Sequence, residues 1–152
     1  MYQRVLVPLD GSRVAEAILP FIEQIAGPLD MEVLLVRVVP LTSMDVAAVA
    51  KEAQRGEPIL KELDAQGYLE PLVASLKAKG VRAGARVRIG DPATEIVAAA
   101  KEINADLIAM TTHGRTGLGR LLFGSVAEAV LRGSPIPVFL LRTSEAALAS
   151  AA

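Results

Sequence analysis

Short runs of apolar residues alternate along the chain with longer segments in which apolar residues recur every three or four positions. The short runs are typical of strands buried on both faces, and the longer segments are typical of amphipathic helices. Five strands and the helices between them account for most of the chain. The strands are expected at residues 4–9, 31–39, 81–89, 107–112 and 136–141.

The strand expected at 81–89 differs from the other four. Its Val, Ala and Ile positions alternate with Arg82, Arg86 and Arg88. Such a period of two indicates one buried face and one polar face. This strand is therefore expected at or near an edge of the sheet, and its arginines are interpreted as a solvated face.

Capping and breaking residues mark the first two helices. Ser12 is expected to cap a helix that ends at Gly27-Pro28, and Pro20 is expected to kink it. A second helical pattern runs over residues 58–79 and ends before a glycine. Residues 41–57, rich in alanine and mixed in charge, are compatible with either a loop or a short helix.

The later helices have clearer boundaries. Asp91, followed by a proline, is expected to cap a helix that ends where Asn104 can adopt a left-handed turn. The last helix is expected at 125–132, with Ser125 and Glu128 forming a capping box.

This order predicts an α/β fold, a three-layer sandwich with a five-stranded, mainly parallel sheet and right-handed crossovers. We expect one domain at residues 1–142 and a frayed tail at 143–152. In such sheets, ligands bind beyond the carboxyl ends of the strands, where the strand order reverses. If the strands at 4–9 and 107–112 are neighbours there, the segments that follow them open onto one crevice.

The composition narrows the function classes. Of the 152 residues, 52% are hydrophobic but only 3% aromatic, so the core must be built from Val, Ile, Leu and Ala. A net charge of −1 argues against nucleic-acid binding. The absence of cysteine excludes disulfides and thiolate sites and fits a reducing compartment. With neither a signal peptide pattern nor an apolar run of about 18 residues, we expect a soluble, cytoplasmic protein that does not enter the membrane.

The segment from Asp106 to Ser125 carries the strongest functional signal. An apolar strand leads into a glycine-rich loop with cationic side chains, and the loop ends where a helix begins. Glycines let the backbone approach an anion, and a helix N-terminus adds partial positive charge, so this layout favours phosphate binding. It matches neither a Walker A motif nor a Rossmann fingerprint, and a solvated loop has a similar composition. The segment contains Gly114, Arg115, Gly117, Gly119, Arg120, Gly124 and Ser125.

Catalytic machinery is not evident. His113, the sole histidine, has no cysteine or acidic cluster beside it, so neither metal binding nor base catalysis is expected of it. We identify no nucleophile–base pair, no pair of carboxylates and no metal-ligand cluster.

These motifs resemble those of the universal stress proteins. Nucleotide-binding members of that family carry glycine, two residues, glycine, nine residues, and then Gly-Ser or Gly-Thr. Gly114 and Gly124-Ser125 have this spacing, whereas Thr111 stands in place of the first glycine. The resemblance extends over residues 4–142 in the expected order. Other matching segments are residues 5–12, 90–92, 124–128 and 135–138.

The resemblance implies a Rossmann-like, adenine-nucleotide α-hydrolase-like fold that binds ATP, with Mg²⁺, and hydrolyses it slowly if at all. It also implies a homodimer, for which the last strand at 136–141 is the expected meeting place. In the family, an aspartate binds the ribose, a valine lies against adenine, and the loop glycines with Gly-Ser hold the phosphates. The corresponding residues are Pro8, Asp10, Val38, Met110, Gly114, Arg115, Gly124, Ser125 and Val126.

Several alternatives stay open. Asp10 could serve only the turn before Ser12, and Ser125 could serve only as a helix cap. The chain could be a dimerisation or interaction module that kept the fold without a nucleotide. It could also be an enzyme of the wider superfamily that adenylates a substrate, although so compact a chain leaves little room for an acceptor site.

Overall fold

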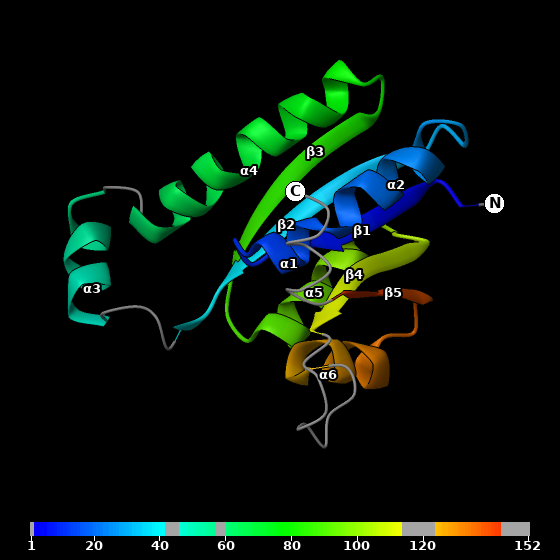
Figure 1. Cartoon of the computed structure of the whole chain (residues 1–152). Coiled ribbons are helices and arrows are strands. Elements are labelled where there is room, and N and C mark those ends of the chain that lie inside the picture. Colours follow the sequence, from blue (N-terminus) through cyan, green and yellow to red (C-terminus); the bar gives the residue numbers. More distant parts are fainter. Residues whose placement is uncertain (1, 42–45, 57–59, 114–123, 144–152) are drawn as a thin grey trace.

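The structure, a computed structural model, describes residues 2–41, 46–56, 60–113 and 124–143. Five strands form one sheet in the order β3-β2-β1-β4-β5, and every neighbouring pair is parallel (Figure 1). The strands are β1 (Arg4–Pro8), β2 (Glu32–Val39), β3 (Arg82–Ile89), β4 (Leu107–His113) and β5 (Val138–Thr143). The helices are α1 (Arg13–Glu16), α2 (Ile18–Ala26), α3 (Val46–Gln54), α4 (Leu60–Ala78), α5 (Pro92–Glu102) and α6 (Ser125–Gly133).

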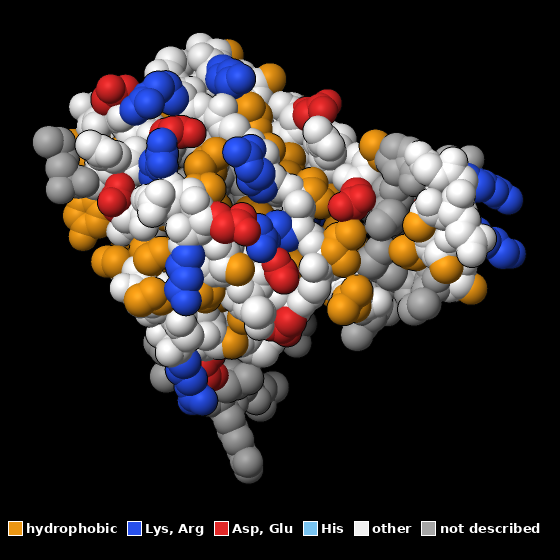
Figure 2. All heavy atoms as spheres, turned by 180° about the vertical axis from the view of Figure 1, so that it is seen from behind, with side chains coloured by type: hydrophobic (Ala, Val, Ile, Leu, Met, Phe, Trp, Pro, Cys, Tyr) orange, Lys and Arg blue, Asp and Glu red, His pale blue; other side chains and the backbone are white. Residues whose placement is uncertain are grey.

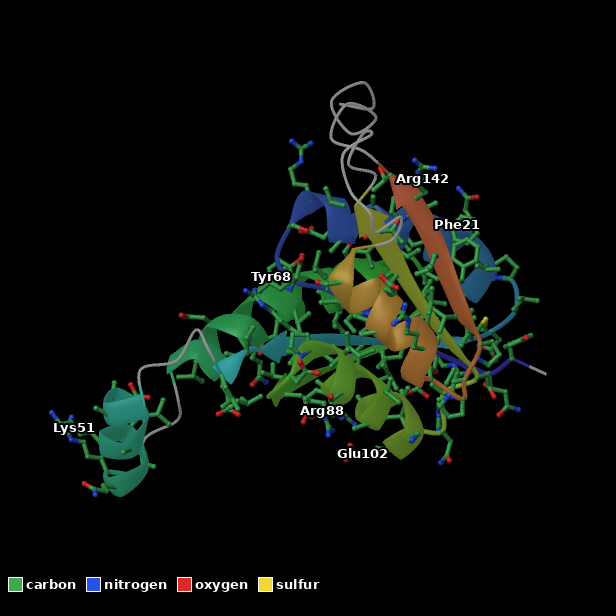
Figure 3. The ribbon with its side chains drawn as sticks, turned by 90° about the horizontal axis from the view of Figure 1, so that it is seen from below. Phe21, Lys51, Tyr68, Arg88, Glu102 and Arg142 are labelled. Carbon is green, nitrogen blue, oxygen red and sulfur yellow. The ribbon has the colours of Figure 1, made fainter. Side chains whose placement is uncertain are left out.

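Helices cover both faces of the sheet, so the expected three-layer α/β sandwich is confirmed. On one face α4 packs against β2 and β3 and α2 against β4, with Ile18, Ile22 and Leu69 in the core. On the other face α5 packs against β1 and β2, and α6 against β4 and β5, through residues such as Ile96 and Val130. The ambiguous segment at 41–57 contains the helix α3, which stands away from the layered body in two views (Figures 1 and 3).

The sequence predicted the burial of one edge strand correctly and that of the other incorrectly. β3 lies at one edge and is only partly buried, as its alternating pattern predicts. The last strand was expected to be buried at 136–141, and this is wrong for the single chain. β5 begins at Val138 and is half-buried, because it forms the opposite edge and, among the described residues, has a neighbouring strand only in β4. The tail expected at 143–152 lies outside the described residues, except Thr143, which ends β5.

Local signals placed most helix boundaries correctly. The hydroxyl of Ser12 accepts a hydrogen bond from the Ala15 N–H at 3.1 Å, and the carboxylate of Asp91 caps α5. Asn104 has a φ of 54°, the left-handed turn expected of it. The kink expected from Pro20 appears as a break at Ala17, because a proline has no N–H to bond the carbonyl four residues back.

Asp106 ties the start of β1 to the turn before β4. Its Oδ2 accepts hydrogen bonds from the backbone N–H groups of Gln3 at 2.6 Å and Arg4 at 2.9 Å. These two bonds hold the pKa of the Asp106 carboxyl below its usual range. A folded-state pKa below the unfolded value stabilises the fold at pH values above the unfolded pKa of about 4, and this stabilisation is lost as the pH falls further.

We therefore expect acid to destabilise the protein partly through Asp106. Asp106→Ala should lower the free energy of unfolding at pH 7 and should also weaken its decline between about pH 5 and pH 3. Urea denaturation at a series of pH values measures both effects. Glu70→Gln, a change at an exposed helix position, is the control and should leave the profile as in the wild type. An unchanged profile in Asp106→Ala would contradict the assignment.

Candidate functional site

A cleft of about 500 Å³ opens at the carboxyl ends of β1, β2 and β4. β1 lies between β2 and β4, and the chain runs outward from β1 in opposite directions on its two sides. The cleft therefore lies at the point where the strand order reverses, which is where open parallel sheets bind ligands. The first and fourth strands are neighbours here, which is the condition under which the segments that follow them open onto one crevice.

The inner walls of the cleft are apolar. They are formed by Val36 and Val38 of β2, Ile96 of α5, Met110 of β4 and Val126 of α6. Val36 and Met110 are buried and Val38 is half-buried. An apolar slot between two strands and two helices can hold a flat heterocyclic ring, and its size is typical of small-molecule pockets.

Asp10 supplies a carboxylate at the mouth of the cleft. Its Oδ1 accepts hydrogen bonds from the N–H of Ser12 at 2.9 Å and from the Ser12 hydroxyl at 2.6 Å. Asp10 thus does stabilise the turn between β1 and α1. Both bonds use the same oxygen, and the described residues provide no hydrogen bond to Oδ2. The side chain is exposed, so that oxygen is able to accept from a ligand hydroxyl.

The start of α6 lies beside the cleft and corrects one expectation. Gly124, with φ 77° and ψ 155°, is the N-cap, and Ser125 is the first helical residue. The capping box predicted for Ser125 and Glu128 is therefore wrong, because a glycine takes a conformation that serine resists and moves the helix start back by one residue. The first backbone bond of the helix is from the Glu128 N–H to the Gly124 carbonyl, which leaves the preceding N–H groups without a helical partner.

Comparison with known proteins decides the family. Residues 1–142 match the sequence profile of the universal stress protein family. The chain belongs to this family. The resemblance noted in the sequence is thereby confirmed.

Curated and solved family members resemble the chain over nearly its whole length. Universal stress protein MJ0531 of Methanocaldococcus jannaschii is 33% identical over 142 residues, which cover 93% of this chain and 83% of the relative. The solved structure of MJ0577 from the same organism has a TM-score of 0.76 and 27% identity, covering 94% of this chain and 97% of that one. A universal stress protein solved in complex with cAMP has a TM-score of 0.67 and 24% identity, covering 94% and 98%.

The fold of this universal stress protein brings five of the nine residues predicted to bind the ligand to the cleft. Gly124 and Ser125 do not line the cleft, but they immediately precede Val126, which does. Gly114 and Arg115, with the rest of the loop to residue 123, lie outside the described residues. The five that line the cleft are Pro8, Asp10, Val38, Met110 and Val126.

Arg37 and Asp64 also line the cleft and were not identified from the sequence. The Arg37 guanidinium carbon lies 4.8 Å from the centroid of the Tyr68 ring, and the Tyr68 hydroxyl donates to Glu16 Oε2 at 2.9 Å. Burial and this bond to a carboxylate raise the pKa of Tyr68. The sequence did contain a signal for Arg37, because it is a single arginine within an otherwise apolar part of β2. It contained no signal for Asp64, because charged residues are common on exposed helix faces.

Charged side chains are dispersed over the described part of the universal stress protein. Figure 2 shows acidic and basic side chains mixed over one face. Arg88 pairs with Glu95 and Glu102, the last of which is seen beside it in Figure 3. No group of three or more histidine or acidic side chains in the described ranges could hold a metal ion. Within the same ranges, no helix combines the length and apolar character needed to cross a membrane.

Proposed function

We propose that this universal stress protein binds ATP in the cleft and acts as a nucleotide-dependent regulatory protein. The observation that carries the proposal is the combination, at one switch point, of an apolar slot, a carboxylate and a helix N-terminus. A protein of the same fold was solved with cAMP, an adenine nucleotide, which supports the choice of base.

The residues of the cleft fit the three parts of the nucleotide. Val38, Met110 and Val126 provide apolar surface for adenine. Asp10 provides an acceptor for the ribose hydroxyls. The N–H groups at the start of α6, preceded by Gly124, suit the phosphates, because a helix N-terminus attracts anions. In this proposal Gly114 and Arg115 would add to the phosphate site.

The phosphates of bound ATP can themselves coordinate Mg²⁺, because most ligands of this ion are commonly phosphate oxygens and water molecules. Asp10 and Asp64 are the carboxylates that line the cleft, and the described residues form no metal-ligand cluster beside them. Rapid hydrolysis needs a group that orients a water molecule in line with the phosphate. We propose that hydrolysis is slow or absent, and that the bound state itself is the signal.

We also propose that two copies of the chain meet through residues 136–141. Within the described part of the chain β5 is an unpaired edge of the sheet, and such an edge favours pairing with another strand. Phe139 of β5 stacks on Phe21 of α2, with ring centroids 4.6 Å apart, so one face of β5 is anchored while no described strand pairs with its outer edge. Light scattering coupled to size-exclusion chromatography measures the mass in solution.

Equilibrium binding of ATP to the purified protein, followed by calorimetry, tests the main proposal. Binding at millimolar ATP or below, with release of adenine nucleotide from protein purified without added ligand, would support it. No binding at millimolar ATP would contradict it and favour a nucleotide-free interaction module. Formation of pyrophosphate from ATP would instead indicate an adenylating enzyme.

The missing signature glycine is expected to have little effect on binding. Thr111 lies in extended β4, paired in register with Leu141, and it does not line the cleft. Side chains alternate along a strand, so Thr111 points to the face opposite Met110. Thr111→Gly should change the dissociation constant for ATP by less than about threefold and lower stability by about 1 kcal/mol, because glycine weakens a strand. A tenfold gain in affinity measured by calorimetry would show that threonine limits binding.

A further inference from the structure

Arg37 is a half-buried cation that the proposed nucleotide contacts do not use. It lies in β2 next to Val38 and lines the cleft. It forms no salt bridge in the described part of the chain, whereas Arg4, Arg82 and Arg88 all do. A half-buried guanidinium without a paired carboxylate loses hydration, so its position calls for other favourable contacts.

Two features accommodate the guanidinium. One is the Tyr68 ring of α4, at 4.8 Å from the ring centroid, a distance at which cation–π attraction is effective. The other is the space left by the missing side chain of Gly11, which has a φ of +90°. A Cβ atom at Gly11 would lie 3.3 Å from both Nη nitrogens of Arg37, so glycine leaves room for the arginine as well as allowing the turn.

The turn that carries Asp10 lies beside this arginine–tyrosine pair. The Arg37 guanidinium occupies the space next to Gly11, just after Asp10, and lies over the Tyr68 ring. Tyr68 in turn donates to Glu16, the last residue of α1. Side chains from β2 and α4 thus constrain the turn between β1 and α1 and the short helix that follows it.

Direct binding of a ligand phosphate by Arg37 is disfavoured by the surrounding charges. Asp10 and Asp64 line the same cleft as Arg37, and Glu16 accepts from the hydroxyl of Tyr68 beside it. Carboxylates on this side of the cleft disfavour an added anion, because like charges repel. The arginine is better suited to acting on the protein than on the phosphates.

We propose that Arg37 is a positioning residue that, with Tyr68, sets the turn between β1 and α1 so that the Asp10 carboxylate meets the ribose hydroxyls of the nucleotide. This inference rests on the proposed binding of ATP in the cleft. It assigns discrimination at the sugar to a pair of residues that do not touch the sugar.

Comparison of ATP with 2′,3′-dideoxy-ATP tests the inference, because the second nucleotide lacks both hydroxyls. Wild-type protein is expected to bind ATP at least about tenfold more tightly, the range of a hydrogen bond to a charged group. Arg37→Gln and Tyr68→Leu should weaken ATP binding and leave dideoxy-ATP within about twofold, so that the ratio approaches one. Arg37→Lys, which keeps a cation beside the ring, should retain part of the ratio.

Arg86→Gln is the matched control, since Arg86 is an exposed arginine of the neighbouring strand whose side chain, among the described residues, donates only to the adjacent carbonyl of Ala85. It should bind both nucleotides as the wild type does, and circular dichroism should show every variant folded. A purely structural role for Arg37 would weaken both nucleotides equally, which overturns the inference. Wild-type binding of ATP without preference over dideoxy-ATP also overturns it and leaves the proposed function standing, whereas no binding of ATP removes both.

Discussion

Gly124→Val is expected to reduce ATP affinity by at least about 100-fold while the protein stays folded. Gly124 has φ 77° and ψ 155°, a region that is essentially restricted to glycine. A β-branched residue must either leave this region or stay in it at a strain of about 1–3 kcal/mol. Either response moves the N–H groups at the start of α6 that are proposed to hold the phosphates. Calorimetric titration with ATP, beside thermal melting followed by circular dichroism, measures both properties.

Gly80→Val separates backbone strain from loss of the site. Gly80 also has a positive φ, of 81°, and no described atom lies within 4 Å of where its Cβ would be. It follows α4 and does not line the cleft. Both variants should lose some thermal stability, but only Gly124→Val should lose affinity for ATP. If the Gly124 variant keeps its affinity, the phosphates bind somewhere other than the start of α6.

Leu69→Ala is expected to lower the free energy of unfolding by about 2–5 kcal/mol. Leu69 has no exposed surface and packs from α4 into the core with Leu35. Pro71, inside the same helix, cannot donate a helical hydrogen bond, so α4 depends strongly on its packing. Urea denaturation measures the change, and the urea dependence of the free energy should be unaltered.

Leu63→Ala is the control on the same helix. Its side chain is 48% exposed, so truncation leaves no internal cavity and should cost less than about 1 kcal/mol. Equal losses in the two variants would contradict the assignment of Leu69 to the core. Because α4 also carries Tyr68, Leu69→Ala is further expected to weaken ATP binding before the protein unfolds.

The parts of the fold that the sequence predicted correctly are those encoded by neighbouring residues. The apolar runs of the central strands, the alternation in β3 and the cap at Asp91 each lie within a few positions, and all three appear in the structure. The five cleft residues were found because the resemblance to the family, which extends over the whole domain, assigns ligand-binding roles to these positions. Local sequence and the family resemblance were sufficient for these features.

The features that were missed depend on conformation or on distant contacts. Ser125 is a preferred capping residue, yet the cap is Gly124, because its positive φ is a property of the folded backbone. Arg37 acquires its place through Tyr68, 31 positions later along the chain, and no pattern within β2 names that partner. The exposure of β5 follows from its rank at the edge of the sheet, which only the assembled strand order defines.

The cleft draws its lining from both sides of β1, with Asp10 and Val38 from the first part of the chain and Met110 and Val126 from the last. Neither half of the sheet holds a complete binding surface alone. A bound nucleotide would therefore act as a clasp between the two halves, and its binding energy would be lost as soon as either half opened. Occupancy would then stabilise the molecule against separation of its two halves, including the edge strands β3 and β5 that do not line the cleft.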